Sequence, residues 1–222
     1  MPVATISSMY DSANKRAKLY TFTASSATVR TYSATGYREP DIVTDYDNTA
    51  SNYANNGVKK NGTSSDIASG AEFKEQLQIE FETMIESVDK YGGFYIGRYE
   101  TGSGYVVQEN KAPQVSTNWY TFYQKQKEMY ASSGSVISSM LYGAQWDQAL
   151  LWFYNGTAEE KLYVTNSAGK GNYSGSADGY SGVAPTGKTS GADVKNIYDM
   201  AGNVYDWTQE AFYTSGRVGR GR

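Results

Sequence analysis

The chain has 222 residues, of which 39% are hydrophobic, 14% aromatic and 19% charged; it fits one domain of ordinary size and is neither disordered throughout nor a long coiled coil. A net charge of −3 argues against nucleic acid as a partner. The chain contains no cysteine and no histidine, which excludes disulfides, thiolate or imidazole metal ligands and histidine bases, and leaves oxygen-ligated ions such as calcium.

The first part of the chain is predicted to form strands followed by a connector. Alternating residues at positions 20–23 and 28–32 predict one or two short strands. Residues 45–70 are rich in Asn, Gly, Ser and Asp, which is typical of a loop or mobile connector. We therefore divide the chain into an N-terminal segment, residues 1–68, and a main domain, residues 69–222. No apolar run has the length of a signal peptide or a membrane span, so we expect a soluble protein, whose cellular location and oligomeric state stay open.

Three segments of the main domain are predicted to be helical. The first begins with a capping box, in which Ser69 is the N-cap and Glu72 the reciprocal acid, and it ends at Gly92. Its apolar residues recur at helical spacing: Phe73, Leu77, Phe81, Met84, Ile85 and Val88. The other predicted elements are a helix near residues 117–130, a helix over residues 142–154, a strand over residues 94–96 and a turn at residues 101–104.

Residues 155–190 contain many glycines and almost no aliphatic residues, and we expect one long loop, for whose organisation a bound ion is one candidate. Within it, residues 182–189 match the phosphate-loop pattern GxxxxGK[ST]. We do not predict nucleotide binding, because that chemistry needs an apolar strand before the loop and a helix after it. Here a Gly- and Ser-rich stretch precedes the pattern, and residues 190–193 make a poor helix start.

Residues 196–208, with the sequence NIYDMAGNVYDWT, are the most informative stretch. They closely resemble the signature of the formylglycine-generating enzyme (sulfatase-modifying factor) family, YDMxGNVWEW, with Tyr205 in place of the first Trp and Asp206 in place of Glu. Three further stretches follow the family order: FYIGRYE at residues 94–100, MLYGAQWD at residues 140–147 and APTG at residues 184–187. The resemblance covers roughly residues 92–222. It implies a C-type-lectin-like α+β fold with long irregular loops, small twisted antiparallel sheets and two to three helices.

The resemblance also implies calcium sites in the loop and the signature, where members of the family are similar in binding Ca²⁺. At the signature, the implied ligands are the carboxylates of Asp199 and Asp206 and the carbonyls of Gly202 and Val204. At a second site, they are the Asp178 carboxylate, the Asn172 side chain and the carbonyls of Tyr173 and Tyr180. Oxygen ligands with glycine between them suit a hard cation. The alternative is that Asp199 and Asp206 only cap turns. We expect Tyr205 and Trp207, beside these ligands, to be core aromatics.

The missing cysteines and histidines bear on the functions that the resemblance implies. The family's oxidases hold copper with paired cysteines, a related branch holds iron with histidines, and this chain has neither residue type. The family's cysteines lie downstream of the signature, past a segment that residues 217–222 resemble. The chain is therefore either a non-catalytic member or a fragment that ends before its catalytic segment. The carboxylates of Glu100, Asp147 and Asp206 could converge for acid–base chemistry, but nothing in their spacing requires it.

We favour a non-catalytic ligand-binding module that recognises a protein or a glycan through exposed loops, because Tyr, Ser, Gly and Asn are frequent, as in binding loops. Such a module resembles the variable proteins of diversity-generating retroelements, which are often encoded by phages or bacteria and carry a mutated ligand surface just after this signature. The alternatives are a truncated formylglycine-generating oxidase, whose copper-binding cysteines lie beyond residue 222, and a structural phage or surface component.

Overall fold

The computed structural model describes residues 4–13, 16–30, 37–38, 56–173, 180–212 and 216–221. This part of the chain is mixed α+β, as predicted, and contains five α-helices together with short antiparallel strands. The helices are α1 (Ile6–Met9), α3 (Gly70–Tyr91), α4 (Trp119–Glu128), α5 (Gly143–Tyr154) and α6 (Ala158–Thr165). The strands are β1 (Tyr10–Asp11), β2 (Arg16–Ala17), β3 (Tyr20–Phe22), β4 (Ala27–Val29), β5 (Tyr37–Arg38), β6 (Thr101–Gly102), β7 (Val106–Val107), β8 (Asp193–Val194), β9 (Ile197–Tyr198), β10 (Asp206–Phe212) and β11 (Gly216–Arg220).

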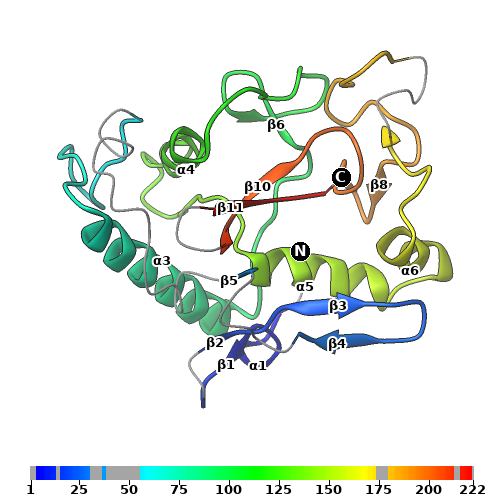
Figure 1. The fold of residues 1–222 in the computed structure, drawn as a ribbon, viewed down its shortest axis with the longest axis horizontal. Coiled ribbons are helices and arrows are strands. Elements are labelled where there is room, and N and C mark those ends of the chain that lie inside the picture. The colour runs from blue at the N-terminus through cyan, green and yellow to red at the C-terminus, as the bar shows by residue number, and fades with distance from the viewer. Residues whose placement is uncertain are drawn as a thin grey trace.

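The largest sheet brings β5 beside the C-terminal hairpin. Its three antiparallel strands have the order β11-β10-β5, and the β10–β11 pairing is interrupted by a bulge between Trp207 and Ala211. The other strands pair as two-stranded hairpins, β1–β2, β3–β4, β6–β7 and β8–β9. In Figure 1 the β10–β11 pair runs through the middle of the molecule, with α3 and α4 toward one end and α6 toward the other. Among the described residues, no helix combines the length and the apolar character that crossing a lipid bilayer requires.

The three predicted helices are confirmed, and the ends of the first follow the expected capping chemistry. The Ser69 hydroxyl accepts a hydrogen bond from the Glu72 N–H (3.1 Å), and Gly92 ends α3 with a left-handed φ of 72°. The Glu72 carboxylate accepts the N–H of Ala68 (2.7 Å), one residue before the position that a capping box uses. Helices α4 and α5 fall inside their predicted ranges. Strand β3 lies within its predicted range, and β4 overlaps the predicted residues 28–32, of which 31–32 lie outside the described residues. The turn predicted at residues 101–104 is found at residues 103–105, because residues 101–102 form β6.

The strand expected at residues 94–96 is wrong, because the structure assigns these residues to no strand. Phe94 belongs to an apolar cluster with residues of α3 and α5, whereas Tyr95 is 89% exposed. The alternation of buried and exposed side chains therefore reflects an extended segment with one buried face. A strand also needs backbone pairing, which alternation alone does not report.

The predictions of two to three helices and of one long loop over residues 155–190 are also wrong, since they leave out α1 and α6. Helix α6 begins with its own capping box, in which the Thr157 hydroxyl accepts the Glu160 N–H (3.2 Å) and the Glu160 carboxylate accepts the Thr157 N–H (2.7 Å). Of its eight residues only Tyr163 is buried, so almost no apolar periodicity reveals it. Helix α1 has four residues, too few for a periodic pattern.

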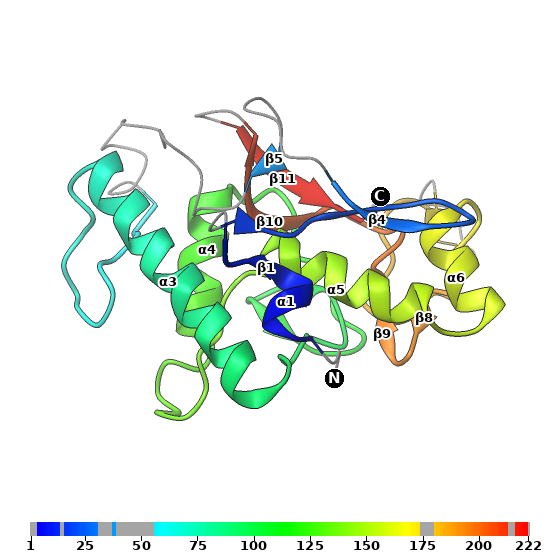
Figure 2. The same ribbon diagram turned by 90° about the horizontal axis from the view of Figure 1, so that it is seen from below.

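The N-terminal residues pack into the same core as the helices that follow them. Met9 and Leu19 share an apolar cluster with Phe81 of α3 and with Tyr142, the N-cap of α5. Figure 2 shows α1 and β1 lying against α3 and α5. The boundary at residue 68 remains a prediction about chain organisation, and the described residues on its two sides pack against each other.

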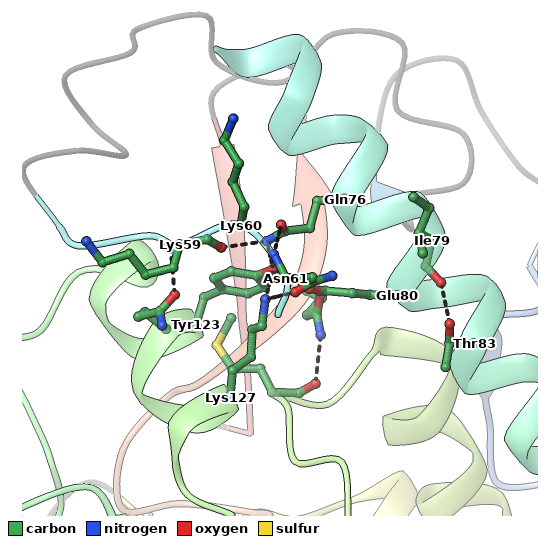
Figure 3. A network of polar contacts seen from close by, with 12 residues as sticks. Lys59, Lys60, Asn61, Gln76, Ile79, Glu80, Thr83, Tyr123 and Lys127 are labelled. Atoms are coloured by element: carbon green, nitrogen blue, oxygen red, sulfur yellow. Dashed lines mark hydrogen bonds and ion pairs between the residues drawn. The ribbon is translucent and has the colours of Figure 1, made fainter. Parts of the chain in front are cut away.

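A polar network ties the connector before α3 to α3 and α4 (Figure 3). The Tyr123 hydroxyl of α4 donates to the Glu80 carboxylate of α3 (2.7 Å), which also accepts from Lys127 (2.6 Å). The Gln76 amide donates to the Tyr123 hydroxyl (3.0 Å) and to the carbonyl of Lys59 (3.1 Å). Because Tyr123 is fully buried, these bonds satisfy a hydroxyl that would be costly to bury alone.

Candidate functional site

The signature forms a sharply turned segment between β9 and β10. Its backbone takes left-handed φ angles at Asp199 (61°), Gly202 (87°) and Asn203 (62°). A Cβ atom on Gly202 would lie 3.0 Å from the backbone carbonyl carbon of Asn172, so this close approach requires glycine. Asparagine is among the few other residues that adopt the left-handed region readily. The turn therefore requires glycine at position 202 and favours asparagine at position 203.

The Asn203 side chain holds three separate segments together. Its Nδ2 donates to the Glu100 carboxylate (2.6 Å) and to the Ala184 carbonyl (3.2 Å). Its Oδ1 accepts from the Ala184 N–H (2.8 Å) and from Nδ2 of Asn172 (3.0 Å). These four bonds use the full hydrogen-bonding capacity of a side-chain amide. Asn203 thus fixes the loops around the signature.

Asp199 is buried, with 1% of its surface exposed, and lies against the loop that carries the phosphate-loop pattern. Its Oδ2 accepts the Gly187 N–H (2.7 Å), while its Oδ1 has no hydrogen-bond partner among the described residues. Burial raises the pKa of Asp199, and the hydrogen bond from Gly187 opposes that shift. One oxygen of this carboxylate therefore caps a turn, which is compatible with both of the roles considered from the sequence. Residues 190–191 form a turn that leads into β8, so no helix follows the pattern, as predicted.

Glu100 and Asp206 face an inner cavity of about 140 Å³. Glu100 is 6% exposed and accepts the Val204 N–H (3.3 Å) besides the Asn203 amide, whereas the Asp206 carboxyl makes no hydrogen bond within the described part of the chain. Burial, together with the nearby charges of Asp206 and Asp199, raises the pKa of Glu100 to about 10. Burial and the charge of Asp199 raise the pKa of Asp206 to about 8. Both carboxyl groups therefore favour the protonated form near neutral pH.

Asp147, the third carboxyl group considered for acid–base chemistry, does not line this cavity. It is fully buried, accepts the Tyr20 N–H (2.7 Å) and pairs with Arg220 (3.3 Å). Two of the three carboxyl groups therefore come together at the signature. Asp147 instead anchors the β3–β4 hairpin and β11 to α5.

The second predicted calcium site is described only in part. Asn172 is 1% exposed, and its Nδ2 donates to the Gly182 carbonyl (2.8 Å) and to the signature turn. Tyr173 is half-exposed and Tyr180 is partly buried. Asp178 lies outside the described residues. Over the described ranges, no three or more acidic side chains are grouped so that they could hold one metal ion.

A larger groove, of about 620 Å³, lies beside the inner cavity. It is bounded by the segment of residues 114–118 before α4, by α4 itself and by the paired strands β10 and β11. Its walls include three aromatic side chains, those of Phe122, Tyr205 and Trp207. All three also line the inner cavity, so the groove and the cavity share a wall.

Tyr205 and Trp207 differ in how far they enter the core. Tyr205 is 61% exposed, so the expectation that it is a core aromatic is wrong. Tyr205 lies just before β10, and its Cβ packs beside Gly219, where an added Cβ would lie 3.2 Å from it. Trp207 is half-buried against the core and donates its indole N–H to the Thr117 carbonyl (3.3 Å).

Arg217 is the one charged side chain among the described residues that line the groove. Its guanidinium carbon lies 4.7 Å from the centre of the Trp119 ring and 5.5 Å from that of Tyr120. Stacking on these rings fixes the orientation of the planar group. Sequence analysis did not single out Arg217 or Phe122, because only the pairing of β11 with β10 beside α4 brings them to one surface.

In comparisons with known proteins, no family model, no curated protein and no solved structure matches the chain. The resemblance to the formylglycine-generating enzyme family therefore rests on the quoted motifs, and the function has to be argued from the site.

Proposed function

We propose that this protein is a non-catalytic ligand-binding module that recognises a glycan or a protein through its loops. The observation that carries the proposal is the 620 Å³ groove with its aromatic walls and the polar segment of residues 114–118. A concave surface with aromatic walls and a few polar groups is the usual form of a ligand site. Tyrosine and tryptophan supply rigid contact area, and serine, threonine and asparagine supply adaptable hydrogen bonds.

The scaffold that we propose for this module is the C-type-lectin-like fold of the formylglycine-generating enzyme family. In support, the residues that match the signature form a turn, and the Asn203 side chain of that turn makes hydrogen bonds to the flanking loops. The groove begins at Tyr205, inside the signature, and continues onto β11. The variable proteins of diversity-generating retroelements, which the chain resembles, likewise carry their ligand surface just after this signature.

We also propose a structural calcium ion at the signature. In support, Oδ1 of Asp199 is buried without a partner among the described residues, and the Asp206 carboxyl likewise has none. The carbonyls of Gly202 and Val204 belong to the same turn. Since Ca²⁺ takes about six to eight oxygens, water or further carbonyl groups would complete the shell. A cation here would also favour the charged form of the neighbouring carboxyl groups.

The binding proposal is tested with variants of two exposed tyrosines, one in the groove and one outside it. Tyr205→Ala removes an aromatic wall of the groove, while Tyr95→Ala removes an 89% exposed tyrosine that does not line it. Purified protein is first screened on glycan and protein arrays, and hits are measured by biolayer interferometry. We expect a saturable ligand whose affinity falls at least about tenfold in Tyr205→Ala, equivalent to about 1.4 kcal/mol, and is unchanged in Tyr95→Ala. Equal affinity of all three proteins for every ligand would contradict the proposal, as would the absence of any saturable ligand.

A further inference from the structure

We propose that Lys127 and Asn61 join covalently: the side-chain amine of Lys127 displaces ammonia from the side-chain amide of Asn61 and forms an isopeptide bond, with Glu80 as the proton carrier. The three side chains come from α4, from the connector before α3 and from α3, and they meet in the polar network of Figure 3. The cross-link is independent of the proposed binding function, because none of the three residues lines the groove.

Lys127 of α4 extends its amine to both partners. Its Nζ lies 2.5 Å from Oδ1 of Asn61 and 2.6 Å from Oε1 of Glu80 (Figure 3). Since a C=O bond is about 1.23 Å long, Cγ of Asn61 is no more than about 3.7 Å from the amine nitrogen. Reacting atoms in a productive arrangement are about 3–3.5 Å apart, so a small rotation brings the amine onto the amide carbon.

Hydrogen bonds to neighbouring residues hold the three groups in place. The Asn61 N–H donates to Oε1 of Gln76 (2.8 Å), which fixes the connector against α3. The Glu80 carboxylate accepts from the Tyr123 hydroxyl (2.7 Å). The Nζ of Lys127 lies 3.0 Å from the same hydroxyl and 4.7 Å from the centre of the Tyr123 ring. Groups that are already oriented in this way react far faster than the same groups free in solution.

Partial burial distinguishes this lysine from another paired lysine nearby. The exposed fractions of the Lys127 and Glu80 side chains are 19% and 15%, against 37% and 53% for Lys59 and Asp66. The attacking amine has to be neutral, and Glu80 is placed to take its proton. This transfer leaves two neutral groups, which are less costly to bury than two charges.

The reaction balances without a further reactant. Glu80 takes one proton from the Lys127 ammonium, and the amine then attacks Cγ of Asn61 to form the new C–N bond. Glu80 passes its proton to Nδ2 of Asn61 and accepts a second proton from Nζ, as a general acid and base. The C–Nδ2 bond breaks with its electron pair going to the departing ammonia, which carries the last proton away as ammonium. Asn61 is exposed, so this product can escape to solvent.

The bond closes a long loop of the chain. Asn61 and Lys127 are 66 positions apart, and a cross-link over that separation strongly restricts the unfolded chain. It also ties the connector to α4, the helix that carries Phe122 of the groove wall. The expected consequence is a more stable protein with a more rigid α4.

The test is the intact mass of the denatured protein, measured by high-resolution mass spectrometry as purified and after prolonged incubation. Three variants are compared with the wild-type protein. Lys127→Arg keeps the positive charge but removes the amine that reacts. Glu80→Gln removes the proton carrier. Lys60→Arg is the matched control, because Lys60 is adjacent to Asn61 in the chain and pairs with Glu72 instead.

We expect the wild-type protein and Lys60→Arg to be lighter than their sequences by one ammonia molecule. A tryptic digest of either should contain a branched peptide that joins Asn61 to Lys127. Lys127→Arg and Glu80→Gln should keep their full masses. The melting temperature of Lys127→Arg should lie about 10 °C below that of Lys60→Arg, because the loop is no longer closed.

Two other reactions also release a small molecule, and the same measurements separate them. An Asn–Gly step such as Asn61–Gly62 can lose ammonia by closing on the glycine nitrogen, and that loss would persist in Lys127→Arg. An amide between Lys127 and Glu80 would release water instead of ammonia. Either result overturns the proposal, as does a wild-type protein that keeps its full mass after incubation.

The role of Glu80 is tested separately. Loss of ammonia from Glu80→Gln as readily as from the wild-type protein overturns its assignment as the proton carrier. If Lys127→Arg does not fold, the presence or absence of the branched peptide in the wild-type digest decides. None of these outcomes bears on the groove, so the proposed binding function stands or fails on its own test.

Discussion

The ion pairs around Arg220 offer the sharpest test of how the C-terminal hairpin is held. Arg220 of β11 makes a bidentate pair with Glu210 of β10, with Nε–Oε2 and Nη2–Oε1 distances of 2.7 Å, and reaches Asp147 of α5 at 3.3 Å. Glu210 and Asp147 are both 0% exposed. Two carboxylates can be buried this deeply because guanidinium groups neutralise them.

The substitution Arg220→Met removes the guanidinium and keeps much of the apolar length of the side chain. Removing one partner of a buried pair costs about 3–5 kcal/mol, because the other partner stays buried without its counter-charge. Arg30 lies 3.7 Å from Asp147 and 3.8 Å from Glu210, and it offsets part of the loss. We therefore expect a loss of about 3 kcal/mol at pH 8. The double variant with Glu210→Gln should recover part of it, since one buried charge fewer is left unpaired.

The loss should also depend on pH, through Asp147. Burial raises the pKa of Asp147 to about 6, and the charge of Arg220 opposes that rise. The folded-state pKa lies above the unfolded value of about 3.9, so the native state holds this proton more tightly. The stability that this group contributes is fully present below about pH 4 and is lost as the pH rises through 6. Without Arg220 the pKa rises further, and Arg220→Met should therefore lose less stability at pH 5 than at pH 8.

Urea denaturation, followed by circular dichroism at pH 5 and pH 8, measures these free energies of unfolding. Lys188→Met is the control, because its 2.6 Å pair with Glu109 lies at the surface, where solvent screens the charges and the pair contributes little to stability. The reasoning is refuted if Arg220→Met loses no more stability than this control at pH 8. Equal losses at the two pH values would refute the part of the argument that depends on Asp147.

Three further predictions concern the signature and its cavity. Without bound calcium, the pKa of Asp206 is raised to about 8 and that of Glu100 to about 10, so the native state holds both protons more tightly than the unfolded state. In calcium-free buffer, stability should therefore fall as the pH rises through 8 and 10, and Glu100→Gln should flatten this fall in thermal melts. EDTA should lower the melting temperature and excess Ca²⁺ should restore it, and no shift in either direction would count against a bound calcium ion. Gly202→Ala should cost about 2–3 kcal/mol in urea denaturation, because it combines a positive φ with a 3.0 Å approach to Asn172, whereas Gly62→Ala, at a positive φ in open space, should cost about 1 kcal/mol.

The parts of the fold that can be predicted from the sequence are those whose signals are local. The boundaries of α3 follow from a cap at Ser69 and a stop at Gly92, both within a few residues of the helix they delimit. Helix α6 has an equally local capping box, but its weak apolar face hides it in a Gly-rich stretch. The false strand at residues 94–96 fails for the opposite reason, since its alternation is genuine and its partner strand is absent from the described residues.

The candidate site also has a part that the sequence predicts and a part that it does not. The turn at Gly202 and Asn203 is predictable, because the residue types report the backbone angles they must adopt. The groove is not, because Phe122 and Arg217 are 95 positions apart in the chain, as their numbers show, and meet only through packing. For Asp199, the motif suggests a calcium ligand, which stays a prediction, and the structure adds a contact that the motif does not report: one carboxylate oxygen accepts the Gly187 N–H.

The departures from the family signature fall on particular faces of the structure. Gly202 and Asn203, which form the turn and bond the surrounding loops, match the signature. Tyr205, which replaces Trp, points outward beside Gly219 and lines the groove, and Asp206, which replaces Glu, faces the inner cavity. Substitution costs little in stability at an exposed groove residue and much at a turn that admits only glycine. On the scaffold and the binding role that we propose, a chain that keeps the turn and changes the groove residue Tyr205 is what we expect when the fold is retained and the ligand is exchanged.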